Sequence, residues 1–486
     1  MKLNRQEDGL YFADLIHSKQ ASAEEVVTES IRQIEEKNPS INAVIHNRFE
    51  KALKEARTKD FSNKPFAGVP ILIKDLGQSL AGEPNTSGAK LFKNVISSQT
   101  SHYTQKLLDA GFIILGQTNT PEFGFKNITE PELYGPTRNP WDESYSPGGS
   151  SGGSSAAVAS GMVPLAGASD GGGSIRIPAS FTGLVGLKPT RGRTPIGPGS
   201  GRAWQGASID FALTKSVRDT AAMLDVLQVI QASAAFQVPL FASGYQKELA
   251  NHPTKKFRIA YSTQSPIRSS VSDEAKRAVL KTVKWLEEQG HIVEEKEPDI
   301  DGIDLMESYY LMNCGETTAV LEGIERSLGR DFTVEDMELV TWVMYHSGKK
   351  ISAASYSNTI KSWDVAAEIM ARFRESYDLY LTPATADSAP KVGTKWQSDS
   401  LMEKMAHIYE FNTEEQQKIV WDMFGDSLPV TPFGMQANLS GEPAISLPVH
   451  LTKEGLPLGV QFIAPKGKEH WLLHIGKDME DAGLFI

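Results

Sequence analysis

The chain has 486 residues and a formal net charge of −11, and its length allows one large hydrophobic core or about two to three domains. An acidic chain without a Lys/Arg block matches neither nucleic acid nor an anionic membrane surface, so neither partner is expected. Because Cys314 is the single cysteine, the chain can form neither an intrachain disulfide nor a cysteine-rich zinc site. The sequence has no apolar run long enough to span a membrane and no apolar signal core, which favours a cytoplasmic location.

The first 60 residues are expected to be mostly helical. Ser22 and Glu25 have the spacing of a capping box, which predicts a helix that begins after Ser22 and turns Val27 toward the core. The dipeptide formed by Asn38 and Pro39 predicts the end of that helix, because a residue that precedes proline disfavours the helical conformation.

Strands and helices are then predicted to alternate. Residues 69–73 (VPILI) predict a short buried strand, and Lys74 stands at its end. A helix over 103–110 is expected to lead into a second strand over 112–115. This alternation is typical of an α/β fold whose sheet is largely covered by helices.

Residues 144–206 differ from the rest in being rich in glycine and serine and poor in charge. Such a composition also fits a flexible linker. However, the glycines frame apolar segments at 156–159, 163–168 and 181–187, which linkers rarely contain. We therefore expect a tightly folded loop region near an active site.

The second half resumes the α/β pattern, and residues 303–425 are expected to be mostly helical. Ser272 is placed to cap a helix that Gly290 ends. Further short strands are expected at 258–261, 291–293, 379–381, 444–447 and 460–463. Because neither a repeat nor a low-complexity linker divides the chain, we expect a single large domain.

Two short serine motifs suggest other hydrolase types. Residues 148–152 (GGSSG) fit the nucleophile elbow of α/β-hydrolases, but nothing in the context of His407 or His450 singles either out as the required base. Residues 87–90 (SGAK) fit the S-x-x-K pattern of penicillin-binding enzymes, which a chain of this length contains easily by chance.

Longer motifs point elsewhere. Two glycine–serine runs, SPGGSSGGSSAAVASG and ASDGGGSIRIPASFTGLVGLKPTRGR, occupy residues 146–161 and 168–193. Together with AGVPILIKDL, LGQTNTPEFG, GPTRNPWD, NLSGEPAISLPV and GLPLGVQFIA they keep their order along most of the chain. In these motifs the sequence resembles the amidase signature family.

The resemblance implies one amidase domain with a mostly covered, central mixed β-sheet flanked by helices. Within it, residues 1–60 would form a helical N-terminal part and 61–225 the signature core. Residues 230–425 would form a variable, mostly helical region that shapes the substrate site, and 426–486 a return to the core.

The resemblance also implies a catalytic set. Lys74 matches the catalytic lysine of the family, Ser150 the bridging serine that follows a cis peptide bond, and Ser174 the nucleophile. The backbone amides of Gly171, Gly172 and Gly173, with that of Ser174, match the oxyanion hole. No metal or cofactor is required by this implied mechanism.

Elementary chemistry agrees with these roles. A serine hydroxyl is a weak nucleophile and needs a base within hydrogen-bond reach. Lys74 follows an apolar strand, and burial there would lower the pKa of its amine toward the working range. The glycines before Ser174 let several amides converge on one point. Asp170 and Arg176 flank this loop and are expected to brace it. Gly171 departs from the more common family form, which has a β-branched residue there.

Three further residues are candidates for substrate contacts. Phe125 and Asn127 follow the NTPEFG motif and are predicted to line the site. Cys314 lies in the variable region that shapes the substrate cleft in this family, although a single cysteine is more often a buried filler.

Within the family, the GLKPTRGR run with GPG after it, TEPE at 129–132 and the position of Cys314 look most like 6-aminohexanoate cyclic dimer hydrolase-type amidases. The expected function is therefore a serine amidohydrolase that cleaves small or linear and cyclic aliphatic amides, including 6-aminohexanoate oligomers, through an acyl-enzyme. The expected partner is a small-molecule amide, and family analogy alone suggests a homodimer.

Two alternatives remain open at this point. The glutaminase subunit of a tRNA-dependent amidotransferase shares the same triad, but residues 191–199 (RGRTPIGPG) stand where that subunit usually has a YGRVS-like run. A catalytically inactive scaffold with the same fold is the other alternative, and the presence of Lys74, Ser150 and Ser174 argues against it.

Overall fold

The computed structural model describes residues 4–251 and 255–486. Within this part of the chain, one sheet of eleven strands has the order β1-β3-β2-β4-β6-β5-β10-β11-β9-β7-β8. The strands are β1 Val44–Asn47, β2 Pro70–Lys74, β3 Ile113–Thr118, β4 Leu165–Asp170, β5 Val185–Lys188, β6 Ile209–Thr214, β7 Arg258–Tyr261, β8 Ile292–Glu295, β9 Leu379–Pro383, β10 Ala444–Leu451 and β11 Pro457–Ile463.

The sheet is mixed, as expected. β2 runs parallel to both of its neighbours, β3 and β4, and β7 runs parallel to β8 and β9. The strands between these two groups are antiparallel, from β4 through β6, β5, β10 and β11 to β9. Parallel pairing of β2 with β4 matters most for function, because the carboxyl ends of both strands reach the same edge of the sheet.

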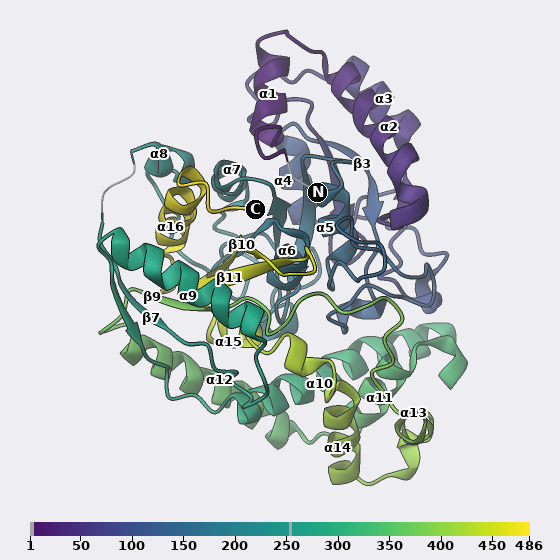
Figure 1. Cartoon of the computed structure of the whole chain (residues 1–486). Coiled ribbons are helices and arrows are strands. Elements are labelled where there is room, and N and C mark those ends of the chain that lie inside the picture. Colours follow the sequence, from purple (N-terminus) through teal and green to yellow (C-terminus); the bar gives the residue numbers. More distant parts are fainter. Residues whose placement is uncertain (1–3, 252–254) are drawn as a thin grey trace.

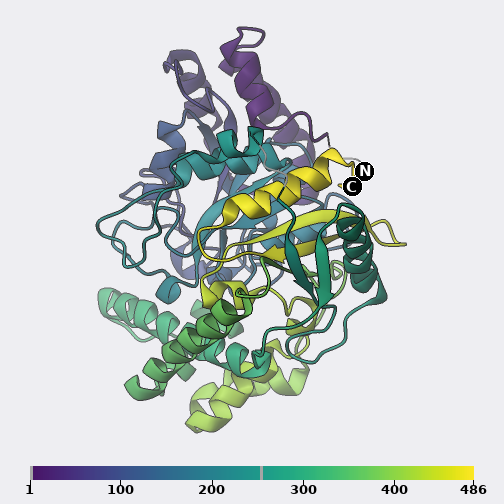
Figure 2. The ribbon, with the colours of Figure 1, turned by 90° about the vertical axis from the view of Figure 1, so that its left-hand side faces the viewer.

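Helices flank this sheet and form a separate group at one end of the molecule (Figure 1). Figure 2 confirms that α1 to α3 lie at the opposite end from α10 to α14. The helices are α1 Gly9–His17, α2 Ala23–Ile41, α3 Phe49–Thr58, α4 His102–Asp109, α5 Gly152–Ala159, α6 Arg176–Thr182, α7 Val217–Leu227, α8 Tyr245–Ala250, α9 Asp273–Glu288, α10 Gly302–Leu328, α11 Leu339–Gly348, α12 Ala353–Phe373, α13 Asp399–Ala406, α14 Thr413–Phe424, α15 Met435–Ser440 and α16 Glu469–Asp481.

Several predicted elements are confirmed. The strand expected at 69–73 is β2, the one at 258–261 is β7, and those near 379, 444 and 460 are β9, β10 and β11. The capping box at the start of α2 is formed in both directions between Ser22 and Glu25. Ser272 caps α9, and its side chain accepts a hydrogen bond from the amide of Ala275.

Helices α1, α2 and α3 predominate in the described part of the first 60 residues, and two details differ from the expectation. This part also contains a strand, β1, which pairs with β3 at the edge of the sheet. The helix expected to end at Asn38 and Pro39 continues to Ile41 and ends with Asn42 in a left-handed conformation. The Asn38 side chain accepts hydrogen bonds from the amides of Ala43 and Val44, which stabilises the turn just beyond the proline.

The description of residues 144–206 as a loop region also needs correction. This part holds α5, β4, α6 and β5, and the two strands lie in the middle of the sheet. Small residues make this possible, because α5, which packs against β2, β3, β4 and β6, consists of glycine, serine and alanine apart from Val158. A Cβ on Gly153 would lie 2.4 Å from the Asn119 amide nitrogen, so the helix and the loop after β3 are in backbone contact.

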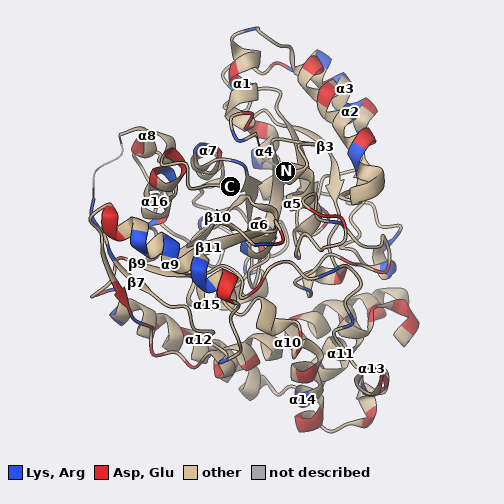
Figure 3. Cartoon of the chain, viewed as in Figure 1, with Lys and Arg blue, Asp and Glu red and all other residues tan. Residues whose placement is uncertain are grey.

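Charge is carried mainly by the outer helices. Figure 3 shows both signs interspersed along α2 and α9, whereas α5 is uncharged. The C-terminal residue lies beside Arg5, whose guanidinium donates to the carbonyl of Ile486 at 2.8 Å. Among the described residues, no helix has both the length and the apolar character needed to cross a membrane.

Candidate active site

Lys74 ends β2, and the parallel pairing of β2 with β4 places it beside Ser169 near the end of β4. The Lys74 amine donates hydrogen bonds to the Ser150 hydroxyl at 2.7 Å and to the Ser169 hydroxyl at 2.9 Å. The position agrees with the general rule that sites of α/β sheets lie beyond the carboxyl ends of the strands. Ser169 was not anticipated, because no local pattern marks it as a partner of a lysine 95 residues away.

The Lys74 amine is fully buried, and this burial lowers its pKa from 10.5 to about 7. The carboxylates of Asp210 and Asp170 oppose the shift but do not cancel it. A lysine with such a pKa is partly neutral near pH 7 and is then able to accept a proton. Burial at the end of an apolar strand therefore lowers the pKa of Lys74 in the direction that the predicted role of a base requires.

Ser150 and Ser174 each follow a run of glycines and stand two residues before the start of a helix. Ser150 precedes α5, and the peptide bond between Gly149 and Ser150 is cis. Ser174 precedes α6, and its carbonyl accepts a hydrogen bond from the Ser151 amide at 3.3 Å. Both serines line the same cavity, so Lys74, Ser150 and Ser174 come together at one place.

The loop between β4 and Ser174 exposes several backbone amides. The Gly173 amide donates to Asp170 Oδ1 at 2.7 Å and is therefore already engaged. Among the described residues, none accepts a hydrogen bond from the amides of Gly171, Gly172 or Ser174. The structure thus leaves these three donors, rather than Gly173, for an oxyanion, and their role stays a prediction.

Gly171, the departure from the common family form, has a packing reason. A Cβ at this position would lie 2.8 Å from the indole ring of Trp204. Trp204 belongs to a loop in which Ala203, Trp204 and Gln205 all have positive φ. The indole of Trp204 therefore occupies the space that a branched side chain at position 171 would take, so Trp204 in this conformation requires glycine at 171.

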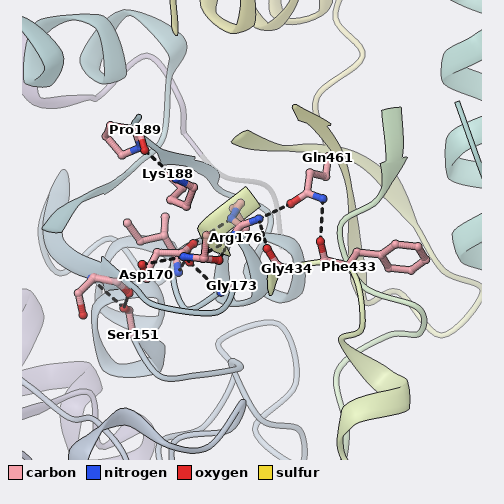
Figure 4. Close-up of polar contacts among 12 residues, drawn as sticks. Ser151, Asp170, Gly173, Arg176, Lys188, Pro189, Phe433, Gly434 and Gln461 are labelled. Carbon is pink, nitrogen blue, oxygen red and sulfur yellow. Dashed lines mark hydrogen bonds and ion pairs between the residues drawn. The ribbon is translucent and has the colours of Figure 1, made fainter. Parts of the chain in front are cut away.

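The Arg176 guanidinium braces this loop through its contacts with Asp170, Gly434 and Gln461 (Figure 4). It donates to both oxygens of Asp170, each at 2.9 Å, and to the carbonyl of Gly434 at 2.9 Å. It also donates to Gln461 Oε1 at 2.6 Å and to Asn438 Oδ1 at 2.7 Å. Since Asp170 and Arg176 are both buried, these contacts satisfy charges that would otherwise be costly.

Asp170 remains ionised in this surrounding. Burial by itself would raise the pKa of its carboxyl, but the charge and hydrogen bonds of Arg176 and the Asn438 amide outweigh burial and hold the pKa well below its usual range. The ionised carboxylate accepts from the amides of Gly173 and Ile175 and so fixes the loop on both sides of Ser174.

A second carboxyl, that of the half-buried Asp210 on β6, also lies near the lysine. The Gln78 side chain accepts from the Lys74 amide at 2.9 Å and donates to Asp210 Oδ1 at 3.1 Å. Burial raises the pKa of Asp210 to about 6, although Gln78 and Lys74 act in the opposite direction. Sequence reasoning missed both residues, since they meet only through the sheet.

Lys188 shows that burial alone does not identify a catalytic lysine. Burial and the neighbouring Arg176 lower its pKa to about 7, as for Lys74. Its amine, however, donates to the carbonyl of Pro189 at 2.8 Å (Figure 4). What distinguishes Lys74 is its contact with Ser150.

The cavity above the serines has a volume of about 770 Å³. Ser150, Ser169, Gly171 and Ser174 lie on its floor, and aromatic side chains line its walls together with part of α10. The Phe125 and Trp204 rings are stacked 6.0 Å apart with an angle of 10° between their planes. The size and the mixed apolar and polar lining are typical of a site for a small organic ligand.

The three predicted substrate contacts fall in different places. Phe125 lines the large cavity and also a smaller one of about 60 Å³ that shares Ser174. Asn127 lines only the smaller cavity, and its amide donates to the Ser427 carbonyl and the Thr431 hydroxyl, both at 2.9 Å. Cys314 is buried against Met344, with 3.6 Å between the two sulfur atoms, and is absent from the described lining of both cavities.

The competing serine motifs lie in other surroundings. His450 pairs with Glu274 at 2.6 Å, and His407 is exposed next to Tyr409. Lys90 of the S-x-x-K pattern forms an exposed ion pair with Glu132. Within the described ranges, no group of three or more His, Cys, Asp or Glu side chains is gathered so that it could hold a metal ion.

Comparisons with known proteins agree with this geometry. The profile of the amidase family matches residues 25–473. A lipoamidase from Enterococcus faecalis is 39% identical over 481 residues; the match covers 98% of this chain, which spans only 63% of that protein. A 6-aminohexanoate-cyclic-dimer hydrolase from a Pseudomonas species is 34% identical over 490 residues, which cover 99% of this chain and 96% of the relative.

A solved structure extends the similarity to three dimensions. The structure of a 6-aminohexanoate cyclic dimer hydrolase complexed with substrate superposes with a TM-score of 0.89 at 32% identity. The match covers 99% of this chain and 98% of the other. The chain therefore belongs to the amidase family of amide-cleaving hydrolases.

Proposed function

We propose that this protein is a serine amidohydrolase that cleaves aliphatic carboxamides through an acyl-enzyme on Ser174. The observation that carries the proposal is the 2.7 Å hydrogen bond from the buried Lys74 amine to Ser150, next to Ser174 in the same cavity. No histidine is needed in this scheme, because the lysine with a pKa lowered to about 7 serves as the base.

The reaction proceeds in two halves. Ser174 Oγ attacks the carbonyl carbon and gives its proton to Ser150, which passes its own proton to neutral Lys74. The oxyanion is stabilised by the amides of Gly171, Gly172 and Ser174, each worth roughly 2.7–4 kcal/mol. The relay then runs backward and protonates the leaving amine as the C–N bond breaks. Water repeats the sequence on the ester, releasing the acid and restoring Ser174.

The proposed substrates are small or linear and cyclic aliphatic amides, with 6-aminohexanoate oligomers as the first candidates. Support comes from the hydrolase relatives that act on the 6-aminohexanoate cyclic dimer and from the volume of the cavity. The 39% identical lipoamidase adds lipoamide, which also joins an aliphatic chain to an amide.

The test is amine release from a panel of amides by wild type and Ser174→Ala side by side. The panel holds short aliphatic and aryl amides, lipoamide, the 6-aminohexanoate cyclic dimer and glutamine. Turnover of aliphatic amides that disappears in the variant supports the proposal. Cleavage of glutamine alone would replace it with the glutaminase of an amidotransferase, and equal turnover by both proteins would remove Ser174 from the mechanism.

A further inference from the structure

The wall of the large cavity formed by α10 carries a carboxylate that the proposed chemistry does not use. Glu316, Thr317 and Val320 line the cavity from this helix. Two other charged residues line it. Asp210 is half-buried and belongs to the surroundings of Lys74, where its Oδ1 accepts from Gln78, and Arg202 is on the loop that carries Trp204.

The Glu316 side chain is held in place by two neighbours. Its Oε1 accepts a hydrogen bond from Gln205 Nε2 at 2.9 Å and a second one from the Tyr356 hydroxyl. Both bonds go to the same oxygen, and among the described residues none donates to Oε2. Because Glu316 is only partly buried and lines the cavity, Oε2 remains for a ligand.

The rest of the cavity suits a cation at this position. The aromatic residues Phe123, Phe125 and Trp204 line the same cavity, and the rings of the last two are stacked on each other. Aromatic faces attract ammonium groups, and a carboxylate that is fixed by neighbours pairs with them. The guanidinium of Arg202 packs 5.8 Å from the ring of Phe236, which lies in the segment between α7 and α8.

We propose that Glu316 is a specificity-determining residue that selects amides whose acyl part ends in an ammonium group. This inference rests on the amidase activity proposed above. The acyl part is assigned to this cavity because two cavities share Ser174, and the one of about 770 Å³ is far larger than the one of about 60 Å³. The larger cavity accommodates the aliphatic chain of the acyl part, and the leaving amine departs on the opposite side of the scissile bond.

The experiment compares ω-amino amides with neutral amides of the same chain length, for instance 6-aminohexanamide with hexanamide. A series from four to eight carbons covers different distances between Ser174 and Glu316. Wild type should have the lower KM for the charged member at one or more lengths. In Glu316→Gln the KM for that member should rise about tenfold, since a hydrogen bond to a charged group is lost, while KM for the neutral amide stays within about twofold.

Two controls distinguish a role of Glu316 in binding the ammonium group from a purely structural role. Glutamine keeps the acceptor oxygen for Gln205 and Tyr356, so the wall should remain intact, and an unchanged melting temperature checks this. Glu322→Gln makes the same change of charge on α10 outside the cavity lining, where Glu322 forms only a long contact with Arg326 at 3.9 Å. It should leave the ratio of the two KM values unchanged.

A third measurement uses wild type alone and does not depend on the folding of a variant. Raising the ionic strength should increase KM for the charged amides and not for the neutral ones. An equal rise of KM for both members in Glu316→Gln, or a wild type without preference between them, overturns the assignment of Glu316. Failure of the catalytic proposal would look different, because Ser174→Ala would then still hydrolyse hexanamide.

Discussion

The ion pair between Arg176 and Asp170 leads to a prediction in which the loss of activity and the loss of stability can be measured separately. Replacing Arg176 by leucine removes five hydrogen bonds and leaves the Asp170 carboxylate buried without its partner. Breaking a buried ion pair from one side costs about 3–5 kcal/mol in free energy of unfolding. The entropy of unfolding is about 2.1 cal/mol/K per residue, or roughly 1 kcal/mol/K for 486 residues, so the melting temperature should fall by about 3–5 °C.

The catalytic loss should exceed what lower stability explains. Asp170 holds the amides of Gly173 and Ile175, so a shift of this carboxylate displaces the neighbouring oxyanion donors. Removal of one such donor lowers kcat by about 100-fold or more. The assay is steady-state hydrolysis of an amide that wild type cleaves, measured well below the melting temperature of the variant.

Arg193→Leu is the matched control. Arg193 is also buried and pairs with a buried carboxylate, Glu469, but it does not line the large cavity. This variant should lose similar stability and keep kcat within a few-fold of wild type. If Arg176→Leu lowers kcat no more than Arg193→Leu does, the loop does not depend on the Asp170–Arg176 pair and the reasoning is refuted.

Four further predictions follow from single contacts. Because Lys74 must be neutral and its pKa is lowered to about 7, kcat/KM should rise with pH through about 7, and a flat profile from pH 6 to 8 would contradict this role. Ser169→Ala removes a bond to Lys74, so it should lower kcat with little change in KM. Gly153→Ala forces a Cβ into the backbone of Asn119 and should cost about 1–3 kcal/mol in a denaturant titration, whereas Gly323→Ala in α10, which meets only a side chain at 3.9 Å, should not. Cys314→Ala should leave KM for every amide of the panel unchanged, because the thiol packs against Met344.

Local signals predicted the elements whose causes are local. The capping box of Ser22 and Glu25 sets the start of α2, and the apolar run before Lys74 forms β2 because it is covered on both faces. Pro39 shows the limit of such signals. Its unfavourable effect on the helix is outweighed by Asn38, whose side chain binds two amides of the next turn.

The central strands β4 and β5 were harder to predict, because their small residues give no alternating apolar pattern. A Cβ at Gly167 would lie 2.2 Å from the side chain of Gln78, so the space at this position of β4 is already occupied. A segment rich in glycine and serine is therefore easily interpreted as a loop when the strands and helices that pack against it are not known.

The residues of the site also differ in whether a local sequence pattern marks them. Lys74, Ser150 and Ser174 were found because long motifs mark them. Ser169 and Glu316 were not found, since each acquires its partners only when distant elements meet. Cys314 was predicted to contact the substrate because of its position in the sequence, but its side chain is buried in the core of the helical region.

The identity of the nucleophile is the central claim, and covalent labelling tests it most directly. Wild type is treated with a fluorophosphonate, and intact mass and peptide mass spectrometry locate the added group, with Ser174→Ala and Ser150→Ala in parallel. A single label on the peptide that contains Ser174, absent from Ser174→Ala and slowed in Ser150→Ala, is the predicted result. A label on Ser150, or unchanged labelling of Ser174→Ala, would contradict the assignment of Ser174.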